Sequence, residues 1–181
     1  ILDGRCWTMP TLANGKIYAR NAKGTLVCVD VAQKKTVALA EMGTAPVEQP
    51  AWPRWKGIKQ DNISTETGLM KQWPEQGPAM LWQYEGLGEG FASVSVADGR
   101  IYTVGMVNKE GFLTCLDMNG KLVWKVSYGP EWSGSVPGVR GTPTLDGDKV
   151  YVISGVGKVF CFNAADGNEI WQKNPFTEFG G

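Results

Sequence analysis

The stretch "CFNAADGNEIW" at residues 161–171 decides the fold. It contains an apolar run, then an Asp-Gly pair, then a tryptophan four residues after the glycine. Residues 115–124, "CLDMNGKLVW", repeat this arrangement with a turn that is one residue shorter. Because glycine readily adopts the positive φ of a tight turn, each stretch predicts two antiparallel strands joined by a short turn. In both, the tryptophan falls at the beginning of the second strand.

Three longer segments, 10–30, 93–117 and 143–163, carry one pattern. Each runs from an apolar strand through a turn to a tyrosine, and then through a glycine turn to a strand with a cysteine. With the tryptophan strand added, each unit makes a four-stranded sheet that cannot bury both of its faces alone, so copies must stack. The equivalent residues are Tyr18, Tyr102 and Tyr151 for the tyrosine, and Cys28, Cys115 and Cys161 for the cysteine.

Radial stacking of such sheets gives a β-propeller, whose blades have roughly 40–50 residues. The sequence therefore predicts an all-β fold of propeller blades, each of four antiparallel strands, with blade cores near 8–42, 91–127 and 140–173. Closed propellers have roughly four to eight blades, so we expect an incomplete ring per chain. A homo-oligomer or a partner chain is expected to complete the propeller, because an open blade edge is an aggregation hazard.

The chain is predicted to divide into a first blade at 1–44, a connecting segment rich in proline and tryptophan at 45–78, and an outer strand with two further blades at 79–181. The connecting segment lacks strand alternation, and one short helix is expected near 64–71. The stretch "AMLWQYEG" at 79–86 is expected to be a fourth strand for the first unit, paired either within the chain or across subunits.

The overall composition excludes several classes of function. Lys+Arg and Asp+Glu both number 18, so no net charge favours nucleic acid or an anionic membrane as a partner. No apolar run approaches the ~20 residues of a transmembrane helix, and no signal peptide is visible in this chain. Histidine is absent, which excludes His-dependent catalytic triads and His-ligated metal sites.

The four cysteines form no Cys-x-x-Cys pair, so a zinc ribbon is not expected. Three of them recur at the repeat position, which favours a packing role as a small apolar side chain. Equivalent positions in neighbouring blades are separated by ~10 Å, beyond the reach of a disulfide. We therefore predict Cys28, Cys115 and Cys161 to be buried and unbridged, while Cys6 lies outside the pattern.

The repeat resembles the PQQ-like propeller family, which includes quinoprotein alcohol dehydrogenases and the BamB assembly factor. The tryptophan-docking motif of that family reads Ala-x-Asp-x-x-Thr-Gly-x-x-x-Trp, and residues 161–171 match it with Cys for Ala, Asn for Asp and Asp for Thr. The first unit continues after Asp30 with "VAQKKTV" and lacks both the glycine and the tryptophan. The resemblance implies that Trp82, Trp124 and Trp171 are structural and lie over the turn of a neighbouring blade.

The order of the segments differs from that of the family. Residues 52–78 resemble the beginning of such proteins, and residues 5–31 resemble their end. The resemblance therefore implies a fragment or a permuted piece of a propeller. It also implies a periplasmic or cell-envelope location.

The dehydrogenases of this family hold PQQ between a tryptophan and a disulfide of adjacent cysteines, beside a calcium ion bound by Glu, Asn and Asp. This chain has no Cys-Cys pair and no recognisable calcium pattern. We therefore expect neither PQQ nor calcium, no metal site and no catalytic residues, and a non-catalytic binding or scaffold role toward a protein or a glycan. The alternative is a funnel-site enzyme of the quinoprotein dehydrogenase or glycan-acting type. For the glycan-acting type, the candidate carboxylates are Glu85, Glu89 and Glu131.

Propellers bind ligands at the axial funnel, where the innermost strands begin. Arginine and aromatic side chains are common at binding hot spots, and both occur at these positions. The funnel candidates are Arg5, Trp7, Glu89, Phe91 and Arg140, with Trp132 on the long loop 128–141. A second candidate group is Trp52, Arg54 and Trp55. The alternative for each tryptophan is packing beneath its own loop.

Overall fold

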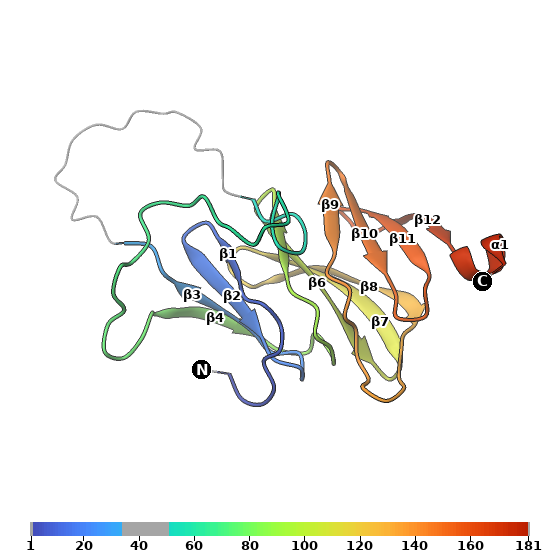
Figure 1. Cartoon of the computed structure of the whole chain (residues 1–181), viewed down its shortest axis with the longest axis horizontal. Coiled ribbons are helices and arrows are strands. Elements are labelled where there is room, and N and C mark those ends of the chain that lie inside the picture. Colours follow the sequence, from blue (N-terminus) through green and yellow to red (C-terminus); the bar gives the residue numbers. More distant parts are fainter. Residues whose placement is uncertain (1, 34–50, 181) are drawn as a thin grey trace.

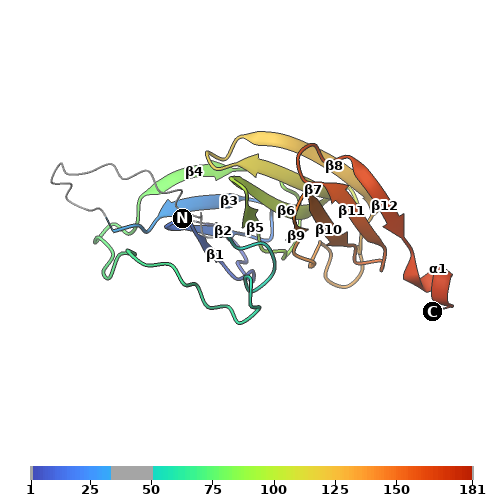
Figure 2. The same ribbon diagram turned by 90° about the horizontal axis from the view of Figure 1, so that it is seen from above.

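The computed structural model describes residues 2–33 and 51–180, and these residues form three four-stranded antiparallel sheets. The sheets stand side by side as a fan (Figure 1). Seen from above, the first strand of each sheet lies on the concave side of an arc and the fourth strand lies on the convex side (Figure 2). Blades are arranged in this way around a propeller axis, and the predicted all-β class is confirmed.

We number the sheets as blades 1 to 3 in chain order. Blade 1 contains β1 (Thr11–Ala13), β2 (Lys16–Arg20), β3 (Leu26–Asp30) and β4 (Met80–Tyr84). Blade 2 contains β5 (Ser95–Ala97), β6 (Arg100–Val107), β7 (Glu110–Asp117) and β8 (Leu122–Pro130). Blade 3 contains β9 (Thr144–Asp146), β10 (Lys149–Ile153), β11 (Val159–Asn163) and β12 (Glu169–Lys173), and a short helix, α1 (Pro175–Phe179), follows it.

Blade 1 is assembled from two parts of the chain that are distant in sequence. β4 pairs antiparallel with β3, so the strand predicted within "AMLWQYEG" completes blade 1 inside the same chain. In every blade, each strand is hydrogen-bonded to the next one along the chain. Of the two pairings that the sequence leaves open, the structure has the one within the chain.

All three blades share one strand register. The tyrosine of the second strand is paired with the cysteine of the third, and that cysteine is paired with the tryptophan of the fourth. A β-bulge follows the cysteine each time. The tyrosine and tryptophan ring centroids lie 6.0 Å apart in blades 1 and 3 and 5.9 Å apart in blade 2. The three sets are Tyr18–Cys28–Trp82, Tyr102–Cys115–Trp124 and Tyr151–Cys161–Trp171.

Apolar side chains fill the space between successive blades. One core cluster joins blades 1 and 2 and includes Leu26 and Ile101. The other joins blades 2 and 3 and includes Val104 and Phe160. The cysteines at the repeat position are buried, as predicted, and each cysteine is a free thiol; the buried ones are Cys28, Cys115 and Cys161, and Cys6 is exposed.

The described part of the connecting segment, 51–78, contains no helix, so the helix expected near 64–71 is wrong. The segment is extended and is held by pairing with the blades. Leu69 forms an antiparallel bridge with Ala32, just after β3. Such tertiary pairing outweighs the small local preference for helix. The part of the segment before residue 51 lies outside the described residues, as does the predicted first blade beyond residue 33.

Residues 86–90, "GLGEG", pass from blade 1 to blade 2 in close backbone contact. A Cβ atom on Gly24 would stand 2.5 Å from the Gly88 nitrogen, and one on Gly88 would stand 2.5 Å from the Met106 carbonyl oxygen. A Cβ atom on Gly105 would collide with the carbonyl of Leu87. Glycine at these three positions therefore lets the main chain cross between the β2–β3 turn and β6 with no side chain in the way.

Candidate functional site

Several loops meet at the end of the blades where the first strands begin. The Ala22 N–H donates to the Arg5 carbonyl at 2.8 Å, and the Gly90 N–H donates to the Ala22 carbonyl at 3.0 Å. The Phe91 N–H donates to the Val139 carbonyl at 2.6 Å. These bonds bring together the funnel candidates from the N-terminal segment, from the connection between blades 1 and 2, and from the connection between blades 2 and 3.

An arginine and two aromatic rings form the centre of this surface. The Trp7 and Phe91 rings are stacked, with centroids 5.5 Å apart and an interplanar angle of 24°. The Arg5 guanidinium carbon lies 4.9 Å from the Trp7 ring centroid. Trp7 is 65% exposed, although a ring of this size is usually covered. We call Arg5, Trp7 and Phe91 the aromatic–arginine cluster; it offers a flat apolar surface with a positive charge beside it.

Three further funnel candidates surround or adjoin the cluster. Glu89 has an exposed side chain, and its backbone pairs with Met106 of β6. Arg140 is exposed and donates to the Val136 carbonyl at 2.6 Å. Trp132 is partly exposed, and a Cβ atom on Gly134 would collide with its ring. Trp132 therefore lies over the backbone of its own loop, which is the packing alternative that the sequence leaves open.

The second candidate group divides into a buried and an exposed part. Trp52 is only 7% exposed and belongs to the core between blades 1 and 2, where the Gly57 backbone lies against its ring. Its indole therefore offers little surface to a ligand. Trp55 is exposed and has the Lys56 ammonium 4.4 Å from its ring centroid. Arg54 has a buried Nε for which the described residues provide no acceptor.

A buried arginine that the sequence did not single out fastens blade 1 to blade 2. Arg20 is 2% exposed and donates to the Val104 carbonyl at 2.6 Å, the Gly88 carbonyl at 3.0 Å and the Thr103 hydroxyl at 3.2 Å. Burial lowers the pKa of its guanidinium to about 10. The alignment of the repeats could have identified Arg20. It stands two residues after the repeat tyrosine, where blades 2 and 3 have the apolar residues Val104 and Ile153.

A buried glutamate fastens blade 2 to blade 3. Glu131 is 4% exposed and accepts hydrogen bonds from the Tyr128 hydroxyl at 2.9 Å, from the Trp132 N–H at 2.9 Å and from the Gly155 N–H. Burial, together with the neighbouring Glu131 charge, raises the pKa of Tyr128. All of these contacts are internal, so the structure gives this carboxylate a structural position.

The tryptophans expected to be structural occupy the contacts between blades. Trp82 donates from Nε1 to the Met118 carbonyl at 3.0 Å, and a Cβ atom on Gly120 would stand 2.6 Å from its ring. Trp124 repeats this contact on blade 3, where it donates to the Ala165 carbonyl at 3.1 Å and a Cβ on Gly167 would stand 2.7 Å away.

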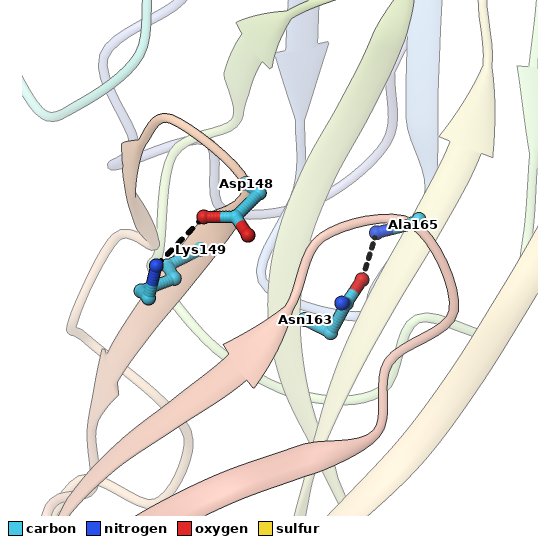
Figure 3. Close-up of polar contacts among 4 residues, drawn as sticks. All are labelled: Asp148, Lys149, Asn163 and Ala165. Carbon is cyan, nitrogen blue, oxygen red and sulfur yellow. Dashed lines mark hydrogen bonds and ion pairs between the residues drawn. The ribbon is translucent and has the colours of Figure 1, made fainter.

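The turn that receives Trp124 is shaped by a side chain from the end of β11. Asn163 accepts from the Ala165 N–H at 2.8 Å and so holds the carbonyls of this turn in place (Figure 3). Nearby, the exposed β9–β10 turn carries an ion pair of Lys149 with Asp148 at 2.7 Å (Figure 3). Trp171 has no such turn to rest on within the described residues and is 39% exposed.

A cavity of about 810 Å³ lies beside the end of β3. It is lined by Asp30 and Gln33 and by residues of the connecting segment between Met70 and Met80. None of the predicted site residues contributes to it. Across residues 2–33 and 51–180, no group of three or more His, Cys, Asp or Glu side chains could hold a metal ion. No helix in the same residues is long and apolar enough to cross a membrane.

Comparison with known proteins agrees with the repeat. A family model described as outer membrane protein assembly factor BamB matches residues 109–181. No curated protein matches the sequence. Among solved structures, a europium-containing methanol dehydrogenase is 18% identical with a TM-score of 0.53, over 90% of this chain and 23% of that one. A quinohemoprotein alcohol dehydrogenase from Comamonas testosteroni is 17% identical with a TM-score of 0.53, over 93% and 21%. BamB from Moraxella catarrhalis is 16% identical with a TM-score of 0.36, over 91% and 47%.

The two dehydrogenases share the fold with this chain, which spans between a fifth and a quarter of their length. Their low identity carries no information about activity. The family match and the shared strand register support each other, because the matched residues include β7 and β8 of blade 2 and all of blade 3. Residues 109–181 therefore match the BamB family model, and the chain as a whole has the β-propeller blade fold of these dehydrogenases.

Proposed function

We propose that the chain is a non-catalytic binding and scaffold module whose ligand contacts the aromatic–arginine cluster. The observation that carries this proposal is Trp7, which is largely exposed although it is stacked on Phe91 and has Arg5 beside it. An exposed, preorganised aromatic surface costs little entropy when it binds, and arginine adds attraction for carbonyl or carboxylate groups.

The ligand class that fits best is a protein segment, with a glycan as the alternative. Both can stack on an indole, but the arginines at this end, Arg5 and Arg140, favour a ligand with main-chain carbonyls or acidic side chains. The matched family is described as an outer membrane protein assembly factor. We extend this to a location in the periplasm or cell envelope and to an extended polypeptide as ligand.

A direct test is to measure binding of an unfolded outer-membrane porin polypeptide, diluted from urea and labelled for fluorescence anisotropy. Trp7→Ala and Arg5→Ala are each expected to weaken binding by about tenfold or more, which corresponds to ~1.4 kcal/mol. The matched control is Trp55→Ala, because Trp55 is also exposed and also has a cation over its ring but lies outside the cluster. Equal affinity of all variants would contradict the proposal. Displacement of the labelled porin polypeptide by maltoheptaose would favour the glycan.

The proposal includes the absence of PQQ chemistry. The residues do not fit the family's cofactor, because the cysteines lie far apart in the sequence and the three at the repeat position are packed in different blades. Titration of the chain with PQQ and calcium is expected to leave the absorption spectrum of PQQ unchanged. A saturable spectral shift with alcohol-dependent dye reduction would replace the scaffold proposal by the dehydrogenase alternative.

A further inference from the structure

Residues 54–63, "RWKGIKQDNI", combine exposed apolar side chains with positive charge. Three of their apolar side chains are largely exposed: Trp55 at 52%, Ile58 at 64% and Ile63 at 69%. The charged residues interleaved with them are Arg54, Lys56, Lys59 and Asp61. Three cations and one carboxylate give this stretch a net charge of plus two, which the neutral total charge of the chain conceals. We call residues 54–63 the basic loop.

The base of the basic loop is fixed on two blades. Trp52 forms an antiparallel bridge with Val96 of β5, with N–H to carbonyl distances of 2.8 and 2.9 Å. The Leu145 N–H of β9 donates to the Pro53 carbonyl at 2.8 Å. The residues immediately before the loop are therefore hydrogen-bonded to the first strands of blades 2 and 3, and the buried Trp52 ring holds them in the core.

The basic loop is closed by its own backbone hydrogen bonds. The Gly57 N–H donates to the Arg54 carbonyl at 3.0 Å, and the Asn62 N–H donates to the Lys56 carbonyl at 3.0 Å. Trp55 and Ile63 are the next residues on either side of this second bond, so they stand at neighbouring positions of the closed loop. A loop that is already ordered loses little conformational entropy when its side chains bind to a surface.

This combination of side chains suits a lipid bilayer better than a folded protein partner. Tryptophan is enriched at the level of the lipid headgroups, and lysine and arginine can lay their apolar stems along a surface while their charges reach anionic headgroups. The Lys56 ammonium already lies 4.4 Å from the Trp55 ring centroid, so charge and indole are presented together. A protein hot spot usually needs a closely matching, desolvated pocket, whereas a fluid bilayer needs no matching shape.

The basic loop and the aromatic–arginine cluster lie at opposite ends of the blades. Val96, which pairs with Trp52, stands near the end of β5, whereas Phe91 stands four residues before β5 begins. In Figure 1 the teal segment that follows residue 50 lies at the top of the molecule and the N-terminal segment lies at the bottom. A bilayer in contact with the loop would therefore leave the cluster open to its ligand.

We propose that the basic loop docks this chain on the surface of an anionic phospholipid bilayer, with the cluster facing away from it. Trp55, Ile58 and Ile63 enter the interface, and the three cations contact the anionic headgroups. The inference goes beyond the function proposed above and does not depend on the ligand of the cluster. It makes the chain a peripheral protein whose binding surface is presented to the solution beside the membrane.

The test is flotation of the folded chain with vesicles of phosphatidylglycerol and phosphatidylcholine in equal parts. Wild type is expected to float with these vesicles and not with phosphatidylcholine alone. Trp55→Ala and the double variant Lys56→Gln, Lys59→Gln should each lower the partition coefficient about tenfold or more. The matched controls should partition as wild type does: Trp73→Ala removes an indole that is 55% exposed outside the loop, and Lys23→Gln with Lys109→Gln removes two exposed charges from the cluster end.

Insertion of the indole is read from quenching of tryptophan fluorescence by phosphatidylcholine brominated on its acyl chains. Wild type on anionic vesicles is expected to lose part of its emission, and Trp55→Phe is expected to lose distinctly less.

Three results would overturn the proposal. The first is wild type that does not float with the anionic vesicles although circular dichroism shows it folded. The second is an equal loss of partition in a loop variant and its matched control. The third is flotation with no difference in quenching between wild type and Trp55→Phe. Porin binding without vesicles is expected to be unchanged in Trp55→Ala, so a failure here is distinct from a failure of the proposed function. If the loop variants instead weakened porin binding in solution, the loop would be a protein contact and the bilayer proposal would be wrong.

Discussion

Trp124 and Trp171 occupy the same place in successive blades and have different surroundings. Each is paired with the repeat cysteine and stacked beside the repeat tyrosine. Trp124 is covered by the turn of blade 3 and donates a hydrogen bond to it, whereas Trp171 is exposed. The repeat thus specifies how the indole is presented, while the neighbouring blade decides how much that indole contributes to stability.

The largest expected effect comes from the docked indole. Trp124→Ala should lower the free energy of unfolding by about 3 kcal/mol, because it removes buried apolar area and leaves a cavity against Gly167. Trp82→Ala should behave similarly, since Trp82 docks within the chain rather than across subunits. Urea unfolding followed by circular dichroism measures both. A loss below about 1 kcal/mol for either variant would show that these contacts do not hold the blades together.

The acceptor side of the contact is tested at its glycine. Gly120→Ala combines an unfavourable φ of 79° with a Cβ 2.6 Å from the Trp82 ring, and should cost about 2 kcal/mol. Gly147→Ala is the matched control: its φ is also positive, at 56°, but a Cβ there meets nothing within 4 Å. The control should cost about 1 kcal/mol from the backbone alone. Equal unfolding midpoints for the two variants would remove the steric part of the argument.

Alkaline pH should weaken the blades at their repeat cysteines. Burial raises the pKa of Cys28 to about 11 from an ordinary value of 9.0. The folded-state pKa is raised, so this contribution to stability is fully present below pH 9 and is lost as the pH rises through 11. This shift of two pKa units corresponds to at most about 2.7 kcal/mol of stability. Cys28→Ala should flatten the decline of the urea midpoint between pH 9 and 11; an unchanged slope would indicate that other groups cause the decline.

The smallest expected effect is at Trp171, the exposed indole of blade 3. Trp171→Ala should change the free energy of unfolding by no more than about 0.5 kcal/mol, because no neighbouring turn covers the exposed indole within the described residues. The comparison with Trp124→Ala is made in the same urea titration. A loss as large as that of Trp124→Ala would mean that Trp171 is covered in the isolated protein, and the contrast between the two indoles would disappear.

The sequence predicts the blades well because the repeat is a local signal. Tyr18, Cys28 and their equivalents mark strand register in three independent copies, and a wrong alignment of one would conflict with the other two. The connecting segment has no repeat to check it. The expected helix near 64–71 fails because Leu69 finds a strand partner in Ala32, and such a partner cannot be read from nearby residues.

The candidate site follows the same division. Arg5, Trp7 and Phe91 are predictable as a group because each precedes a first strand, and first strands gather at the axis of a propeller. Trp52 looks equally available in the sequence, yet the core between blades 1 and 2 receives it. Arg20 joins blade 1 to blade 2 through partners 68 to 84 residues away, such as Val104. Glu131 joins blade 2 to blade 3 through the Gly155 N–H, 24 residues away. Nearby residues do not reveal either of these contacts.

The three glycines around residues 86–90 have a geometric consequence. Gly24, Gly88 and Gly105 let two main chains approach without intervening side chains where blade 2 follows blade 1. In any closed ring, the angles between successive blades sum to a full circle. A methyl group at one of these glycines would push the two main chains apart at this end of the blades and tilt one sheet against the other. The number of blades that such a ring can hold therefore depends on glycine, which has no Cβ, at these three positions.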